Sequence, residues 1–315
     1  MGPVAVALAP VFALILIGAG LRRARLVDDA FWPAVETLVY VLFFPALLFR
    51  TMASARLDAG EVGPMAAALA LAVWGAGLAA LAVGPRRGLD GPAFAAVFQG
   101  AIRPNTYVGL AAAAGLYGEP GLALAAVAIA VVVPSVNLLS VAALARHGAG
   151  DGGGAAGPAA LARAVAGNPL ILAVVAGIAA NLAGLPLVEP IDSTLEILAR
   201  TALPLGLLAV GAGLDLGAAR RAAGRVAMAA TGKLAVMPAL TAAACLALGV
   251  EGAPAAVAVI YTSLPTAASA YVLSRKMGGD APLTAGIITA TTIAAVATVP
   301  AVALILGRVG WGGAP

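Results

Sequence analysis

Charged residues are scarce in this sequence of 315 residues. Asp, Glu, Lys and Arg make up 10% of it and aromatic residues 5%, whereas an ordinary soluble domain carries about 25% charge. Apolar residues account for 62% of the chain. Because so few polar residues cannot cover a water-soluble core, the composition excludes a soluble enzyme and a nucleic-acid-binding protein. It predicts an all-α polytopic membrane protein.

The sequence has one cysteine and one histidine. Cys245 lies in an apolar segment, so we expect a buried free thiol and no disulfide within the chain. His147 lies in a hydrophilic segment, which excludes a Ser/His hydrolase and a histidine-based metal site inside the membrane. The motifs HExxH, GxxxxGK[ST] and DDxxD are also absent. We therefore expect no catalytic residue, no resident metal and no cofactor.

Apolar stretches bounded by charged residues or by Gly and Pro predict ten membrane-spanning helices, since about 20 apolar residues cross a bilayer. A Gly-rich segment at 146–159 is predicted to be a cytoplasmic linker. It separates a first five-helix repeat, residues 1–145, from a second, residues 160–315. The predicted spans are 4–21, 33–52, 62–83, 93–117, 120–144, 167–184, 193–214, 226–248, 254–274 and 282–306.

Most Lys and Arg residues fall in connections on one side of these spans. By the positive-inside rule that side is cytoplasmic, which places the linker inside and both termini in the periplasm of a bacterial inner membrane. The other side has Arg50, Arg56, Arg200 and Arg308, and the two remaining cations, Arg103 and Lys233, fall within predicted spans. The residues on the cytoplasmic side are Arg22, Arg23, Arg25, Arg86, Arg87, Arg146, Arg163, Arg220, Arg221, Arg225, Arg275 and Lys276.

The two halves share landmarks at a nearly constant offset. Two proline pairs are 159 residues apart, and a third proline pair and a glycine pair are 161 apart. Because each half has an odd number of spans, the halves enter the membrane from opposite sides, as inverted repeats do in secondary transporters. The pairs are Pro10 and Pro169, Pro45 and Pro204, Pro104 and Pro265, and Gly118 and Gly279.

Pro104 and Pro265 lie near the middle of the fourth and ninth spans. A proline inside a helix removes a backbone hydrogen bond, and freed backbone groups need a new partner in hydrocarbon. Half-helices that begin near Asn105 and Thr266 would direct N–H groups and positive dipole ends at mid-membrane, where an anion is the complementary ligand. The alternative is a simple kink whose backbone groups bond neighbouring hydroxyls.

Polar residues around these breaks form the predicted site. For Arg103 the alternative to anion binding is a bond to carbonyls freed by the break, and for Asn137 it is a hydrogen bond between helices. Lys233 is expected to extend toward the cytoplasmic interface, with a part in the site as the alternative. The predicted substrate-binding residues are Arg103, Pro104, Asn105, Thr106, Asn137, Ser263, Pro265 and Thr266. The secondary or coupling residues are Gln99, Lys233, Tyr261 and Ser269.

Four segments, 9–50, 102–118, the NPLILAVVAGIAANLAGLPL run from Asn168, and 263–282, resemble the auxin efflux carrier family, including malonate-transporter-like bacterial permeases. The resemblance implies two inverted five-helix repeats whose fourth and ninth helices break at proline and cross, a fold shared with bile acid sodium symporters and sodium/proton antiporters. It implies small organic anions such as dicarboxylates, or indole-3-acetate in plants, as substrates.

Pro104 and Asn105 match the family's fourth-helix crossover motif and Pro265 the ninth-helix one. Thr106 and Tyr107 stand where bacterial members often have Gly, and the large plant loop is missing, so auxin itself is not the expected substrate.

We therefore expect a secondary transporter, an efflux carrier, for a mono- or dicarboxylate that works by alternating access at the crossover. The expected partners are a small organic anion and membrane lipid, with a homodimer as one assembly and no nucleic acid. Uniport and coupling to Na⁺ or H⁺ both remain open. The rival hypotheses are a cation-coupled symporter or antiporter of the same fold, and a membrane sensor that binds a ligand without moving it.

Overall fold

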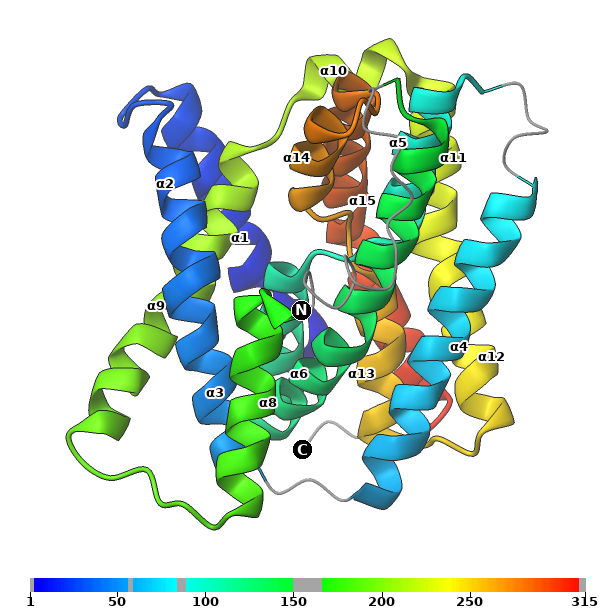
Figure 1. Ribbon diagram of the computed structural model, residues 1–315. Helices are drawn as coiled ribbons and strands as arrows, with labels where there is room; N and C mark the ends of the chain where they lie inside the picture. Colours follow the sequence, from blue (N-terminus) through cyan, green and yellow to red (C-terminus); the bar gives the residue numbers. More distant parts are fainter. Residues whose placement is uncertain (1–2, 56–58, 84–88, 150–165, 312–315) are drawn as a thin grey trace.

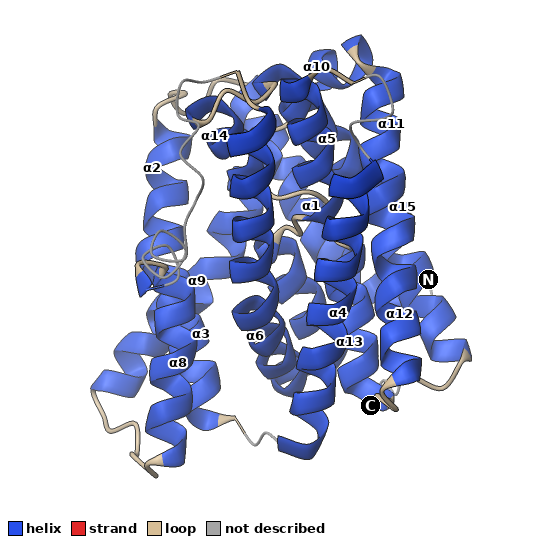
Figure 2. Cartoon of the chain, turned by 45° about the vertical axis from the view of Figure 1, so that its right-hand side comes forward, coloured by secondary structure: helices blue, strands red, loops and turns tan. Residues whose placement is uncertain are grey.

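The computed structural model describes residues 3–55, 59–83, 89–149 and 166–311, and this part of the chain is almost entirely helical (Figure 2). Most of the linker expected at 146–159 lies outside the described residues. The elements are α1 (Pro3–Arg23), α2 (Phe31–Leu38), η1 (Val39–Phe43), α3 (Phe44–Ser54), α4 (Ala59–Val83), α5 (Gly91–Ile102), α6 (Thr106–His147), α8 (Pro169–Leu182), α9 (Ile191–Ala212), α10 (Leu216–Arg221), α11 (Ala223–Thr231), η3 (Gly232–Val236), α12 (Met237–Ala247), α13 (Gly252–Ser263), α14 (Ser269–Lys276) and α15 (Ala281–Arg308).

Within the described residues, seven helices are long and apolar enough to cross a membrane, and α5, α8 and α13 are shorter apolar helices. Helices occupy all ten segments that hydropathy predicts, but the ten-span inverted repeat stays a prediction. The chain turns sharply inside α6 at Gly118, whose φ of 61° favours glycine. In the second half of the chain the comparable glycine is Gly278, which follows α14 and has a φ of 71°. The residue that matches Gly118 in conformation is therefore Gly278, whereas the repeat offset predicted Gly279.

Two wide helical turns, η1 and η3, lie inside long helices. Each ends just before a proline, Pro45 after η1 and Pro238 after η3. A proline donates no hydrogen bond and its ring displaces the carbonyl one turn earlier, so a π-turn ahead of it lets the helix continue. Both turns therefore keep α2–η1–α3 and α11–η3–α12 as continuous rods.

The helices form two groups that are seen side by side in Figure 1. In the first helix group, α1 packs on α9, and α3 packs on both α8 and α9. The second helix group contains α4, α5, α6 and α10 to α15, with α6 packed on α4, α5 and α13. Contacts between the groups are made largely by α6, with α1 also touching α15.

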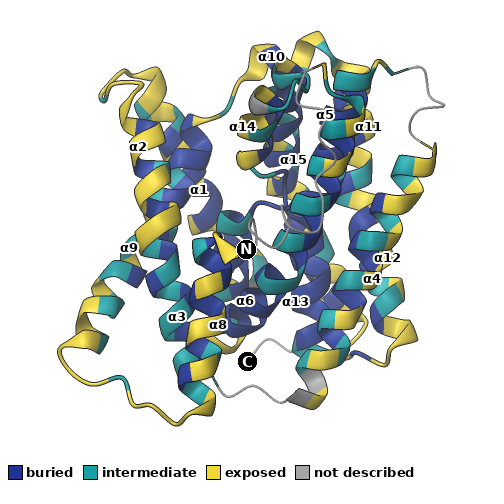
Figure 3. Cartoon of the chain, viewed as in Figure 1, coloured by how far each residue is buried: buried dark blue, intermediate teal, exposed yellow. Residues whose placement is uncertain are grey.

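The burial pattern separates an interior from an outer apolar surface (Figure 3). Buried side chains concentrate on α5, α6 and α13. Large apolar residues such as Ile197 and Leu246 are instead about 70% exposed on outer helix faces. Because soluble proteins rarely leave so many apolar residues exposed, these faces are suited to lipid.

The connections gather at two opposite ends of the molecule. Those after α1, α9 and α14 lie at one end, at the top of Figure 1, and those after α8 and α12 lie at the other. The first end carries Arg22, Arg23, Arg25, Arg220 and Arg221. We call it the arginine-rich end.

Candidate functional site

Two interrupted helices cross at the centre of the molecule. α5 ends at Ile102 and α6 begins at Thr106, while α13 ends at Ser263 and α14 begins at Ser269. Pro104 and Thr266 form an antiparallel bridge between the two extended segments. The Asn105 N–H donates to the Pro265 carbonyl at 2.8 Å, and the Ala267 N–H donates to the Arg103 carbonyl at 3.2 Å. The predicted breaks at both prolines are confirmed.

Asn105 caps the helix that follows the first break. Its Oδ1 accepts hydrogen bonds from the N–H groups of Tyr107, at 3.0 Å, and Val108, at 3.3 Å. Asn168 caps the start of α8 in the same way, and its Oδ1 accepts from the N–H groups of Leu170 and Ile171. The expectation that amides at this half-helix stand unpaired for a ligand is therefore wrong for the two that Asn105 binds.

Thr266 joins the second break to two other helices. Its N–H donates to Thr291 Oγ1 of α15 at 3.1 Å, and its hydroxyl donates to the Gly100 carbonyl of α5 at 2.7 Å. Thr291 is not among the predicted site residues, although it lies in a Thr-rich run, ITATT, that was a usable signal. Ser263 is fully buried, and its hydroxyl bonds the Ile260 carbonyl of its own helix.

Arg103 is the charged residue at the crossover. It is 6% exposed, and the only hydrogen bond of its side chain among the described residues runs from Nη1 to Ser269 Oγ at 3.3 Å. Its Nε and Nη2 atoms are buried and have no partner in the described part of the chain. The alternative in which freed carbonyls bind this guanidinium is therefore not observed.

Aromatic residues line the first break on the side of the first helix group. Tyr107 stacks on Phe44 of α3, with ring centroids 4.7 Å apart and planes at 3°. Tyr40 of η1 lies within electrostatic range of both Arg103 and Tyr107, and Glu36 lies within that range of Tyr107. Glu36 and Tyr40 are not among the predicted site residues, although their i, i+4 spacing places both on one helix face.

A polar chain extends from the crossover through the second helix group. Gln99 Nε2 donates to Ser274 Oγ at 2.6 Å, and the Ser274 hydroxyl lies 2.8 Å from Thr284 Oγ1. Tyr261, also buried, has its hydroxyl 3.4 Å from Thr106 Oγ1. Gln99 and Tyr261 thus hold α5, α6, α13 and α14 together beside the breaks.

The structure contradicts the expected orientation of Lys233. This residue is fully buried, and Nζ donates to the Thr262 carbonyl at 2.6 Å. The side chain cannot extend to the interface because η3 directs it at the end of α13. Asn137 is half-buried in α6, and no hydrogen bond joins its side chain to the crossover among the described residues.

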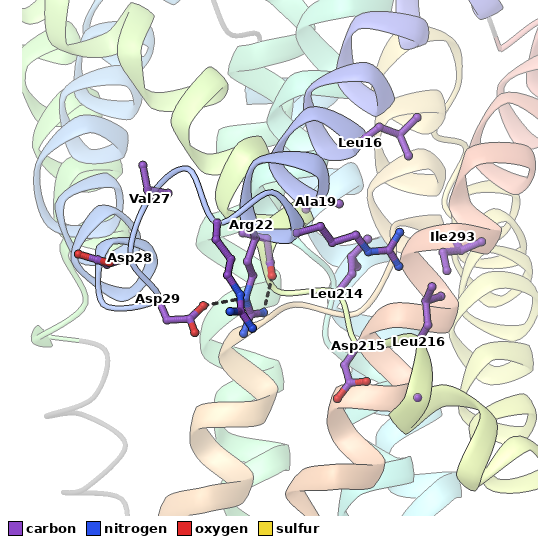
Figure 4. Close-up of a pocket in the computed structure, with 15 residues that line it drawn as sticks. Leu16, Ala19, Arg22, Val27, Asp28, Asp29, Leu214, Asp215, Leu216 and Ile293 are labelled. Carbon is purple, nitrogen blue, oxygen red and sulfur yellow. Dashed lines mark hydrogen bonds and ion pairs between the residues drawn. The ribbon is translucent and has the colours of Figure 1, made fainter.

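A cavity of about 900 Å3 opens at the arginine-rich end, between α1 and the connection from α9 to α10 (Figure 4). Arg22 crosses it, pairing with Asp29 at 3.3 Å and donating to the Ala212 carbonyl at 2.6 Å. Its lining includes Leu216 and Ile293 of the second helix group, so the cavity lies between the groups. None of the crossover residues lines it.

These features define a multi-pass membrane protein built around two broken helices that cross. Residues 160–303 match the family model described as "Membrane transport protein". This match confirms, within residues 160–303, the resemblance to the auxin efflux carrier and membrane transport protein family seen in the sequence. No curated protein matches the chain.

Proposed function

We propose that this protein is a secondary transporter of a small organic anion and that Arg103 is the main group that binds the anion. The observation that carries the proposal is the buried guanidinium whose Nε and Nη2 have no partner in the described residues. No carboxylate pairs with Arg103 there either. A carboxylate ligand would accept two parallel hydrogen bonds from these donors.

Energetics favour this role for Arg103. An arginine at the centre of a membrane helix costs at least about 2.5 kcal/mol on insertion scales, so it persists where it serves an ion or substrate path. The Ser269 hydroxyl accepts a hydrogen bond from Nη1 of the guanidinium, and Ser269 is itself exposed. The unpaired nitrogens are thus one side chain away from solvent-accessible surface.

The proposed architecture is two inverted five-helix repeats in a bacterial inner membrane, with both termini in the periplasm. The arginine-rich end would face the cytoplasm under the positive-inside rule. The first and second helix groups would move against each other to expose the crossover to each side in turn. Export of a monoanion would then follow an inside-negative potential, which contributes about 2.3 kcal/mol per charge per 100 mV.

The first experiment is a thermal-shift screen of the purified protein against mono- and dicarboxylates, followed by uptake of the stabilising anion into proteoliposomes. We expect saturable uptake of that anion. Binding without uptake would instead favour the sensor hypothesis. Uptake that requires an imposed Na⁺ or H⁺ gradient would favour a coupled carrier.

The role of Arg103 is tested by Arg103→Ala. We expect this variant to bind the anion about 10- to 100-fold more weakly, because a hydrogen bond to a charged group contributes about 1.5–3 kcal/mol. Arg200→Ala is the matched control, since Arg200 is exposed on α9 and pairs only with Glu196 among the described residues. Unchanged affinity in Arg103→Ala, or an equal loss in Arg200→Ala, would contradict the site.

A further inference from the structure

The end of α13 has a feature that the proposed anion site does not explain. An α-helix leaves its last four carbonyls without helical partners, and its C-terminus carries a partial negative charge. α13 ends at Ser263 inside the bundle, where water does not satisfy these groups. The Ser263 hydroxyl binds one carbonyl of this last turn, and the Lys233 ammonium binds another, that of Thr262.

At the equivalent end of α5 the carbonyls accept from neutral donors, and the guanidinium of its C-cap residue, Arg103, bonds Ser269 instead. There the Gly100 carbonyl accepts the Thr266 hydroxyl and the Gln99 carbonyl accepts the Arg103 N–H. The two broken helices therefore differ: one ends against neutral donors and the other against an ammonium group. A requirement for backbone hydrogen bonds alone would be met by a hydroxyl at both ends, so the charge at α13 calls for a separate reason.

Lys233 has no counter-ion in the described residues. It is fully buried, and none of the described ion pairs includes it. Burial of an unpaired ammonium costs several kcal/mol, which the negative end of a helix partly offsets. η3 reaches this position because Gly232 packs tightly on α5: a Cβ at Gly232 would lie 2.9 Å from the Ala101 Cβ.

In carriers with broken helices, C-terminal ends of half-helices and freed carbonyls are where a coupling Na⁺ binds. We propose that the Lys233 ammonium is a tethered cation that occupies such a position at the end of α13, so that the carrier needs no Na⁺. A cation that never leaves supplies the charge compensation in every transport cycle. The inference rests on the proposed anion transport, but the binding test below needs no substrate.

The test compares melting temperatures of the purified protein in NaCl, KCl and choline chloride. Wild type should show no Na⁺-specific shift, because the position is filled. Lys233→Ala removes the ammonium and opens space beside the Thr262 carbonyl, so we expect a lower melting temperature that Na⁺ alone raises by about 2–4 °C. Lys233→Met restores the volume without the charge, and Na⁺ should not stabilise it. Lys233→Arg should behave as wild type.

A Na⁺-specific rise in the melting temperature of wild type would overturn the proposal, and so would a folded Lys233→Ala that Na⁺ does not stabilise. If Lys233→Ala yields no folded protein, wild type and Lys233→Arg decide: Na⁺-insensitive melting of both supports the proposal. Anion uptake gives an independent result. Wild-type uptake should be equal in NaCl and choline chloride, whereas absent uptake would count against the transporter and leave the melting result intact.

Discussion

At the scale of single residues, Asn105 combines two tasks that substitutions can separate. Its Oδ1 caps α6, and its position two residues from Arg103 places it beside the proposed anion. Asn105→Asp retains an oxygen that accepts the same two N–H groups, and a negative charge suits a helix N-terminus. That charge also neutralises Arg103 and repels an anion. We expect a melting temperature near that of wild type but at least about tenfold weaker anion binding in a titration.

Asn168 provides the control, because it caps α8 with the same geometry at a distance from the crossover. Asn168→Asp should leave anion binding unchanged. Asn168→Ala and Asn105→Ala should each lose about 0.5–2 kcal/mol of stability, the usual cost of a lost cap. If Asn105→Asp binds the anion as tightly as wild type, the proposal that Asn105 and its neighbour Arg103 form the anion site is wrong.

The residue scale also shows what the sequence could and could not predict about the site. Pro104 and Pro265 locate the breaks because proline acts on its own helix. The partner of Lys233 lies 29 residues away along the chain, and those of Thr266 lie 25 and 166 residues away, all on other elements. Such contacts depend on how helices pack, and spacing in the sequence does not encode them. The sequence gives the position of Lys233 along its span, which favours the interface. It does not give the direction of the side chain, which depends on how the helices pack.

At the scale of elements, the contact between α1 and α9 depends on two glycines. A Cβ at Gly18 would lie 2.0 Å from the Leu208 carbonyl oxygen, and one at Gly211 would lie 1.8 Å from that of Ile15. These neighbours are backbone, so a methyl group forces the helices apart. We expect Gly18→Ala to cost about 1–3 kcal/mol, the usual effect of overpacking, and to lower the melting temperature by several degrees.

Gly20 is the matched control on the same helix, since nothing lies within 4 Å of a Cβ at that position. Alanine there favours the helix by roughly 0.5–1 kcal/mol, so Gly20→Ala should melt at or slightly above the wild-type temperature. Equal melting of the two variants would mean that α1 and α9 are not in backbone contact.

Elements were the most predictable level of this structure. Apolar length located every long helix, because hydrocarbon thickness sets that length. The π-turns were not predicted: Pro45 and Pro238 indicate a local defect, but whether a helix kinks or widens depends on its neighbours. The same limit applies at Gly118, where a repeat offset of 161 pointed to Gly279 while the matching conformation occurs at Gly278.

At the scale of the whole molecule, the two helix groups could not be read from the sequence. Each group combines helices from both halves of the chain: α1 and α3 pack with α8 and α9, and α6 packs with α13. Hydropathy gives the order of spans but not their neighbours. The structure supplies this division, and the cavity of about 900 Å3 at the arginine-rich end lies along it.

This division predicts which side the crossover faces in this conformation. Ser269 is exposed beside Arg103, whereas Thr266 is fully buried three residues earlier. The single native cysteine, Cys245, is also buried, so wild type should not react with a membrane-impermeant thiol reagent.

We expect Ser269→Cys to react in inside-out vesicles and Thr266→Cys to react in neither orientation. A bound carboxylate should slow the reaction of Ser269→Cys, because it occupies the Arg103 nitrogens. Reaction of Ser269→Cys only in right-side-out vesicles would reverse the orientation given by the positive-inside rule, and equal reaction of both variants would contradict the packing at the second break.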